Sequence, residues 1–244
     1  MKLTAIFKQK LNESDWEKEH ERLHLQEMKD WVQKMRIQNT RVVKEGNEWV
    51  IHGDSNVKIR ADDLPLDGDN KCYLPFKFGE VNGDFVIIGN GREKLKSLEN
   101  GPLSVYGNYK AANLWLDNLK GMAGVVHNEC DLSHNVLTEW SGIPSQCGKL
   151  IIHHNKIESF TGISKDWLMG NSLVCDVIQS NLYELIEVEG LDEVSFEHDY
   201  GGTSFGPEVN KAERILNTCL QGSRESIDLQ SDLFDEGLED WTKK

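Results

Sequence analysis

The sequence is short of basic residues. Its 244 residues include 27 Lys and Arg against 41 Asp and Glu, which gives a formal net charge of −14. Proteins that bind the phosphate backbone of nucleic acids need clustered Lys and Arg. The composition therefore argues against direct nucleic-acid binding. It favours a protein that its own charge keeps dispersed, or one with basic partners.

Long apolar segments are missing too. No apolar run approaches the roughly 18 residues that a membrane span needs. Residues 1–14 lack the apolar block of about seven residues that a secretory signal requires. We therefore expect a cytoplasmic protein without membrane contact.

Cysteine pairs and common catalytic signatures are also absent. The five cysteines are an odd number, and their spacing matches no metal-binding pair, so we expect reduced thiols. The sequence has no phosphate-binding loop and no Gly-x-Ser-x-Gly, and Cys219 has no acid or base motif beside it. These absences predict a protein that is not an enzyme and that uses no cofactor.

A short unit does recur four times between residues 74 and 163. Each copy follows the pattern apolar-x-apolar-x-x-Asn-x-apolar-x-x-apolar-x-Gly. Alternating apolar residues indicate a strand with one buried face, and an Asn side chain can bond backbone groups where the chain leaves that strand. The asparagines are spaced by 23, 22 and 20 residues, at Asn90, Asn113, Asn135 and Asn155.

Units of this kind bury their apolar faces only by stacking on one another. We therefore predict an α/β repeat fold, a leucine-rich-repeat-like solenoid of short parallel strands with flanking helices at both ends. Cys130 occupies an apolar position of its unit and is expected in the core. The fit is imperfect, because the first unit carries extra residues 91–94 and the second is one residue short before its Asn.

The flanks show different patterns. Residues 14–37 have a capping-box start and an apolar stripe, which predict a helix that covers the end of the solenoid or binds a partner. Gly46-Asn47 lies between two strand-like segments and predicts a hairpin, and residues 57–74 are interpreted as a degenerate first repeat. Further strands are expected at residues 173–175, 185–191 and 194–196.

Residues 208–221 are predicted to be a short helix. The acidic segment 225–240 contains spaced apolar residues, and we favour a docked helix over a disordered segment there. The predicted organisation is an N-terminal cap (1–48), a solenoid (49–200, divergent after 165) and an acidic helical segment (201–244).

The run from Leu74 to Phe85, followed by Leu98-Glu99-Asn100-Gly101-Pro102, is similar to leucine-rich-repeat proteins of tailed bacteriophages and some bacteria. The resemblance covers residues 49–165. It implies a solenoid and a phage origin, with the host cytoplasm as location. It implies no catalytic residues, since most members have no assigned activity.

Two histidine patterns need separate consideration. His20-Glu21-x-x-His24 matches a zinc-hydrolase motif, but charged residues surround it, so we interpret it as a solvated helix face. His134 and His154 precede the Asn in successive units and are expected about 5 Å apart. His153 and His154 are expected to point in different directions, which argues against a compact metal site, and we predict none.

Outward positions of the strands alternate with core positions and provide a surface for a partner. An alternative is that a terminal helix covers them. The protein is predicted to be a non-enzymatic protein-binding module, a phage-encoded adaptor or inhibitor. Alternatives are an acidic decoy for a basic nucleic-acid-binding surface and, less favoured, a zinc hydrolase. The eight predicted contact residues are Val86, Ile88, Lys110, Ala112, Asp131, Ser133, Ile151 and His153.

Overall fold

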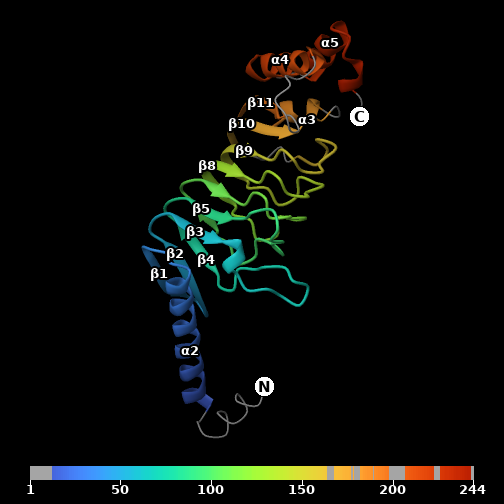
Figure 1. Ribbon diagram of the computed structural model, residues 1–244. Coiled ribbons are helices and arrows are strands. Elements are labelled where there is room, and N and C mark those ends of the chain that lie inside the picture. The colour runs from blue at the N-terminus through green and yellow to red at the C-terminus, as the bar shows by residue number, and fades with distance from the viewer. Residues whose placement is uncertain are drawn as a thin grey trace.

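The structure is a computed structural model that describes residues 13–163, 168–176, 178, 182–188, 190–197, 207–222 and 226–242. The molecule is elongated, with stacked strands in the middle and helices at both ends (Figure 1). In chain order the elements are α2 (Glu13–Lys34), β1 (Thr40–Glu45), β2 (Glu48–Gly53), β3 (Val57–Arg60), a 3-10 turn (Ala61–Asp63), β4 (Phe78–Val81), β5 (Phe85–Ile88), β6 (Ser104–Val105), β7 (Tyr109–Lys110), β8 (Val125–Asp131), β9 (Gln146–Ile151), β10 (Leu168–Asp176), α3 (Tyr183–Ile186), β11 (Leu191–Glu197), α4 (Pro207–Gln221), α5 (Ser226–Asp235) and a second 3-10 turn (Glu239–Thr242).

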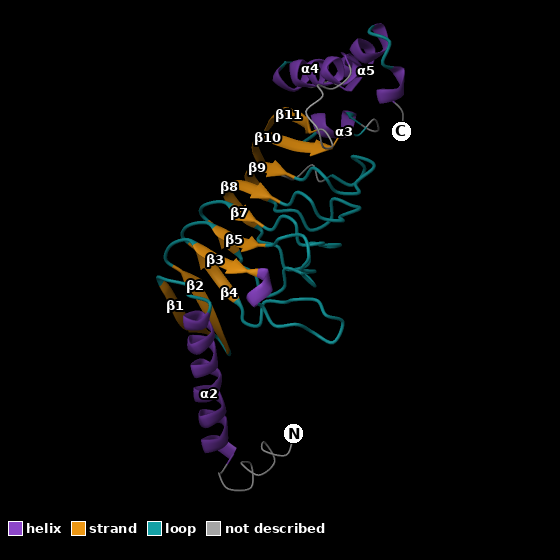
Figure 2. Cartoon of the chain, viewed as in Figure 1, coloured by secondary structure: helices purple, strands orange, loops and turns teal. Residues whose placement is uncertain are grey.

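The strands form a parallel β-solenoid of about five turns. The strands line two sides of the coil, which we call the first and second sheets. The first sheet contains β2, β4, β6 and the beginnings of β8, β9 and β10. The second sheet contains β3, β5, β7, the ends of β8 and β9, β10 and β11. β8, β9 and β10 bend from one sheet into the other (Figure 2). The predicted stack of parallel strands is therefore confirmed.

The core is built from aligned side chains. Register pairs place one residue of each second-sheet strand directly above its neighbour, and none of these side chains exposes any surface. The expected core position of Cys130 is confirmed, and all five cysteines are buried free thiols. The aligned core side chains of the second sheet are Val57, Phe85, Tyr109, Cys130, Leu150, Leu173 and Val194.

A tight bend joins the two sheets in each coil. A Cβ atom on Gly83 would lie 2.3 Å from Asn56 Oδ1, and one on Gly107 would lie 2.5 Å from Asp84 Oδ1. Side-chain oxygens connect the coils here: Asn56 Oδ1 accepts from the amide of Asp84, and Asp84 Oδ1 accepts from that of Asn108. Only glycine fits beside these hydrogen bonds, because any side chain would collide with the preceding coil.

The predicted alignment of four asparagines is wrong for two of them. Asn135 and Asn155 occupy equivalent positions, and each bonds backbone groups of its own coil and the preceding one. Asn113 is one residue out of register. Its amide donates to Ser133 O, and it shares a left-handed backbone with His134. Asn90 is exposed, and its side chain accepts a hydrogen bond within its own loop, from the amide of Arg92.

The coils still stack without those two asparagines, because pairing between strands sets the register and the hydrogen bonds of asparagine side chains do not. The extra residues 91–94 form a loop, and the one-residue shortfall of the second unit places Leu114 where the later units have Asn. The leucine-rich-repeat assignment is therefore not confirmed, although a parallel solenoid is.

At the N-terminal end, the hairpin at Gly46-Asn47 is confirmed, with Glu45 paired to Glu48 across the turn. The predicted helix is also present as α2. Its C-terminal half buries Met28 and Val32 in the core, and the Trp31 ring lies 5.6 Å from that of Phe76. Its N-terminal half projects away from the strands (Figure 1). No helix in the described ranges is long and apolar enough to cross a membrane.

At the other end, strands are confirmed at residues 173–175 and 194–196, within β10 and β11. Residues 185–186 instead belong to the short helix α3, and residues 187–188 and Gly190 are not in a strand. The strand predicted across 185–191 is therefore wrong for these residues, and Glu189 lies outside the described ranges. α4 confirms the helix at 208–221 and lies against β11, the last strand. α5 is docked by buried Leu229 and Leu233, which confirms the docked helix in the acidic segment.

Candidate functional site

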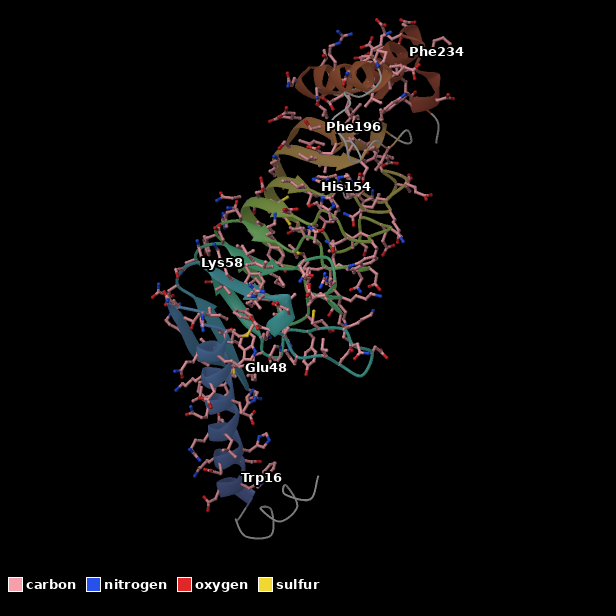
Figure 3. The ribbon with its side chains drawn as sticks, viewed as in Figure 1. Trp16, Glu48, Lys58, His154, Phe196 and Phe234 are labelled. Carbon is pink, nitrogen blue, oxygen red and sulfur yellow. The ribbon has the colours of Figure 1, made fainter. Side chains whose placement is uncertain are left out.

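The outward side of the second sheet carries all eight predicted contact residues. Strand register places them, with two basic residues of β3, in two rows that run along the solenoid. The first row is Lys58, Val86, Lys110, Asp131 and Ile151, and the second is Arg60, Ile88, Ala112, Ser133 and His153. Figure 3 labels Lys58 at one end of this face.

The eight residues differ in how far solvent reaches them. Ile88 exposes 47 % of its surface and the Lys110 side chain 52 %. Val86, Ile151 and His153 are half-buried. The remaining three are buried, so the expectation that all eight are accessible is wrong for Ala112, Asp131 and Ser133.

A compact polar cluster explains part of that burial. The Lys110 ammonium lies 2.5 Å from Asp131 Oδ2, and the Ser133 hydroxyl donates to Asp131 Oδ1 at 2.6 Å. Burial alone raises the pKa of the Asp131 carboxyl, but the hydrogen bonds from Lys110 and Ser133 outweigh it and hold the pKa below its usual value. Asp131 is therefore an ionised anchor beneath Lys110 and not a contact residue itself.

Neither terminal helix lies over this face. α2 packs at the end where β1 and β2 lie, and α4 and α5 lie beyond β11 (Figure 1). Ile88 is exposed, so none of the described helices covers these strands, and the alternative of a covering terminal helix is wrong for the described helices.

A pocket of about 330 Å³ lies where the chain leaves the second sheet. Trp115 lines it, exposes 48 % of its surface, and donates from Nε1 to Gly91 O at 2.7 Å. Sequence analysis missed this residue because Trp115 has a left-handed backbone with φ of 56°, which turns the side chain out of the apolar pattern. The other lining residues are Gly91, Asn113, His134, Asn135, Val136 and His154.

Three histidines gather beside this pocket. The ring centroids of His134 and His154 are 4.2 Å apart, which agrees with the predicted neighbourhood of the two residues. His153 lies only 4.7 Å from His154, so the expectation that these consecutive rings diverge is wrong. The cause is the backbone of His154, whose φ of 56° interrupts the extended alternation. A further histidine, His127, is not part of this cluster. Its ring stacks on that of Tyr106, with the ring centroids 4.6 Å apart.

The His20-Glu21-x-x-His24 motif lies in the middle of α2, one turn beyond Trp16, which Figure 3 labels. The His20 ring stacks on that of Trp16 at 5.1 Å, and the Glu21 carboxylate pairs with Lys44. Within the described ranges, the only three potential metal ligands that converge are His134, His153 and His154. The described part of the chain thus brings no third ligand to the motif.

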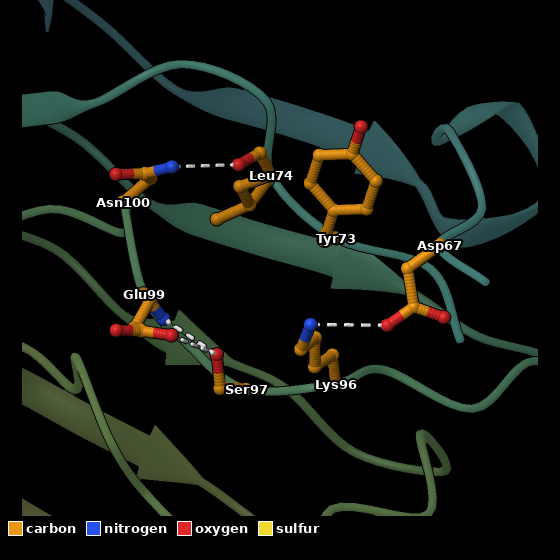
Figure 4. A pocket seen from close by; sticks show the side chains of 7 residues that line it. All are labelled: Asp67, Tyr73, Leu74, Lys96, Ser97, Glu99 and Asn100. Carbon is orange, nitrogen blue, oxygen red and sulfur yellow. Dashed lines mark hydrogen bonds and ion pairs between the residues drawn. The ribbon is translucent and has the colours of Figure 1, made fainter. Parts of the chain in front are cut away.

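A second pocket, of about 240 Å³, lies among the loops that connect β3 to β4 and β5 to β6 (Figure 4). Its charged groups are already paired: Lys96 contacts Asp67 at 3.2 Å, and Glu99 contacts Lys120 at 2.7 Å. The Asn100 amide donates to Leu74 O at 2.9 Å. These groups bond neighbouring coils to each other, which makes the pocket a part of the scaffold.

No family model, no curated protein and no solved structure matches this chain. The fold therefore defines the class, a parallel β-solenoid with an N-terminal helix and C-terminal helices.

Proposed function

We propose that this protein is a non-enzymatic module that binds another protein through the outward face of the second sheet. The observation that carries the proposal is the exposure of Ile88. This residue lies on β5, as half-buried Val86 does, and β5 pairs with β3, which carries the basic residues of the face. An apolar side chain on an open face of a rigid sheet supports contact with a partner. Trp115 at the adjoining bend adds an aromatic anchor of the kind that dominates interfaces.

The finer proposal is a leucine-rich-repeat-like adaptor or inhibitor encoded by a phage, acting in the host cytoplasm. Two features support it. One is the resemblance of residues 49–165 to phage leucine-rich-repeat proteins, and the other is the pair Asn135 and Asn155, whose side chains bond successive coils as asparagines do in such repeats.

The test is capture of a partner by the tagged protein from host lysate. We expect the double variant Ile88→Asp/Ile151→Asp to lose a protein that the wild type retains, because two charges would stand in the apolar part of the face. The matched control is Leu103→Asp, since Leu103 is 60 % exposed and lies next to β6 in the first sheet. Capture by the double variant at the wild-type level, with its fold intact by circular dichroism, would place the binding face elsewhere.

The acidic decoy remains the second candidate, and the net charge of −14 favours it. A decoy competes with DNA for a basic surface, and the competition weakens as salt screens the charges. The second-sheet face carries Lys58, Arg60 and Lys110, so a decoy would have to use another surface. Binding that weakens steeply with salt and survives the Ile88 and Ile151 changes would favour the decoy over the proposed face.

A further inference from the structure

Three histidine side chains from two consecutive coils converge at the edge of the second sheet. His134 follows β8, and His153 and His154 follow β9. Their ring centroids are 4.2, 4.7 and 5.3 Å apart, and one nitrogen from each ring lies within 4.8 Å of the other two. Figure 3 labels His154 beside the strands.

The backbone is left-handed at two of these histidines. His134 and His154 both have φ of 56°, a conformation that is uncommon outside glycine and that asparagine, aspartate and histidine adopt more often than other residues. The preceding coil has Asn113 at the equivalent position, with φ of 60°. Two successive coils thus place an imidazole at a left-handed position, and such positions concentrate at functional sites.

One ring nitrogen of the cluster is enclosed by the protein. His153 Nδ1 has no hydrogen-bond partner within the described ranges. A buried polar atom without a partner requires an explanation, and an ion is one of those that structures supply.

We propose that His134, His153 and His154 bind one divalent transition-metal ion of the zinc type. Three imidazoles are a donor set that suits zinc, copper and nickel, whereas calcium and magnesium need oxygen ligands. Zinc–nitrogen bonds of about 2.0–2.1 Å place tetrahedral ligand nitrogens about 3.4 Å apart. The nitrogens lie within 4.8 Å of one another, so rotation of the half-buried rings closes the site without moving the strands.

The surroundings support such a site. Asp176 accepts hydrogen bonds from the amides of His154 and Asn155, through Oδ1 at 2.7 Å and Oδ2 at 3.1 Å, so its carboxylate fixes the loop that carries two of the ligands. His134 and His154 also line the 330 Å³ pocket beside Trp115. A solvent molecule or a donor from a partner in that pocket can supply a fourth ligand. The site does not depend on the proposed protein-binding function.

The test is titration of untagged, chelator-treated protein with Zn²⁺ by calorimetry, and with Co²⁺ by visible absorption. We expect one ion per chain and a cobalt spectrum of low symmetry with nitrogen ligands. The key variant is His134→Asn/His154→Asn, because Asn113 shows that asparagine adopts this backbone and the fold should persist. We expect Zn²⁺ affinity to fall at least tenfold in this variant and in His153→Ala.

Two controls separate this site from the other histidines. His127→Ala and His20→Ala/His24→Ala should bind Zn²⁺ as the wild type does. Equal affinity in the wild type and in His134→Asn/His154→Asn would overturn the proposal. Loss of binding in the His20 and His24 variant, with the trio intact, would overturn it as well and assign the ion to α2.

Discussion

At the residue scale, single amide side chains hold successive coils together. Asn135 Oδ1 accepts from the amides of Leu114 and Leu116 at 3.1 and 3.0 Å, and Nδ2 donates to Ala111 O and Leu132 O at 2.8 and 3.0 Å. Asparagine suits the position because it offers both an acceptor and two donors.

Asn135→Asp should therefore destabilise the protein by about 2–4 kcal/mol, since a carboxylate cannot donate to the two carbonyls and leaves them buried without partners. Asn113→Asp is the matched control: its side chain is exposed, and aspartate tolerates the left-handed backbone, so a change within about 0.5 kcal/mol is expected. Urea unfolding measures both. Equal costs would mean that the Asn113 side chain also holds successive coils together.

Asp131 gives the protein a pH-dependent contribution to stability. Its pKa is lowered in the folded chain, so its interactions stabilise the fold above the unfolded pKa of about 3.9 and lose that effect as pH falls through the folded value. Asp131→Asn should cost about 1–2 kcal/mol at pH 7 and progressively less as the pH falls below the unfolded pKa of about 3.9, because protonation removes the charge that asparagine also lacks. Urea titrations of both proteins at pH 7 and at successively lower pH values measure this. A cost that does not change with pH would show that the charge of Asp131 contributes nothing.

At the element scale, α4 closes the end of the solenoid. β11 is the last strand, and an open strand edge invites pairing with another chain. Asn217 closes it by accepting from Val194 N at 2.7 Å and donating to Val194 O at 2.9 Å, and Glu213 accepts from Phe196 N at 2.8 Å. The side chains of one helix thus replace the next strand.

Asn217→Ala should lower the free energy of unfolding by about 1–3 kcal/mol, because both backbone groups of Val194 lose their partner. It should also increase self-association, which light scattering after size-exclusion chromatography detects. Thr218→Ala is the control on the exposed side of the same helix, where the hydroxyl donates to Arg214 O. If both variants behave alike, α4 caps the edge by apolar packing alone.

At the scale of the whole molecule, much of the fold could be predicted from the sequence. Period-two apolar patterns, such as that around Cys130, identify buried strand positions, and Gly46-Asn47 identifies a hairpin. The bend between the two sheets was missed, although the recurring pairs Gly83-Asp84 and Gly107-Asn108 mark it. In a single sequence these pairs look like ordinary turns, and only contact with the coil below makes them obligatory.

The candidate site was harder to predict for a related reason. Alternation gives the direction of a side chain only while the backbone stays extended. The left-handed residues Asn113, Trp115, His134 and His154 break it, which exposed Trp115 and brought His153 and His154 together. Asp131 and Ser133 are buried together because Asp131 accepts hydrogen bonds from both Ser133 and Lys110, and strand periodicity does not reveal such side-chain bonds.

The central claim is that the second-sheet face meets another protein, and a photo-crosslinking amino acid tests it most directly. Placed at Ile88, it should form a covalent adduct of one defined mass when the protein is irradiated in cell lysate. Placed at Leu103 on the first-sheet side, which is more exposed than Ile88 (60 % against 47 %), it should form none of that mass. The same adduct from Leu103, or none from Ile88, would contradict the account.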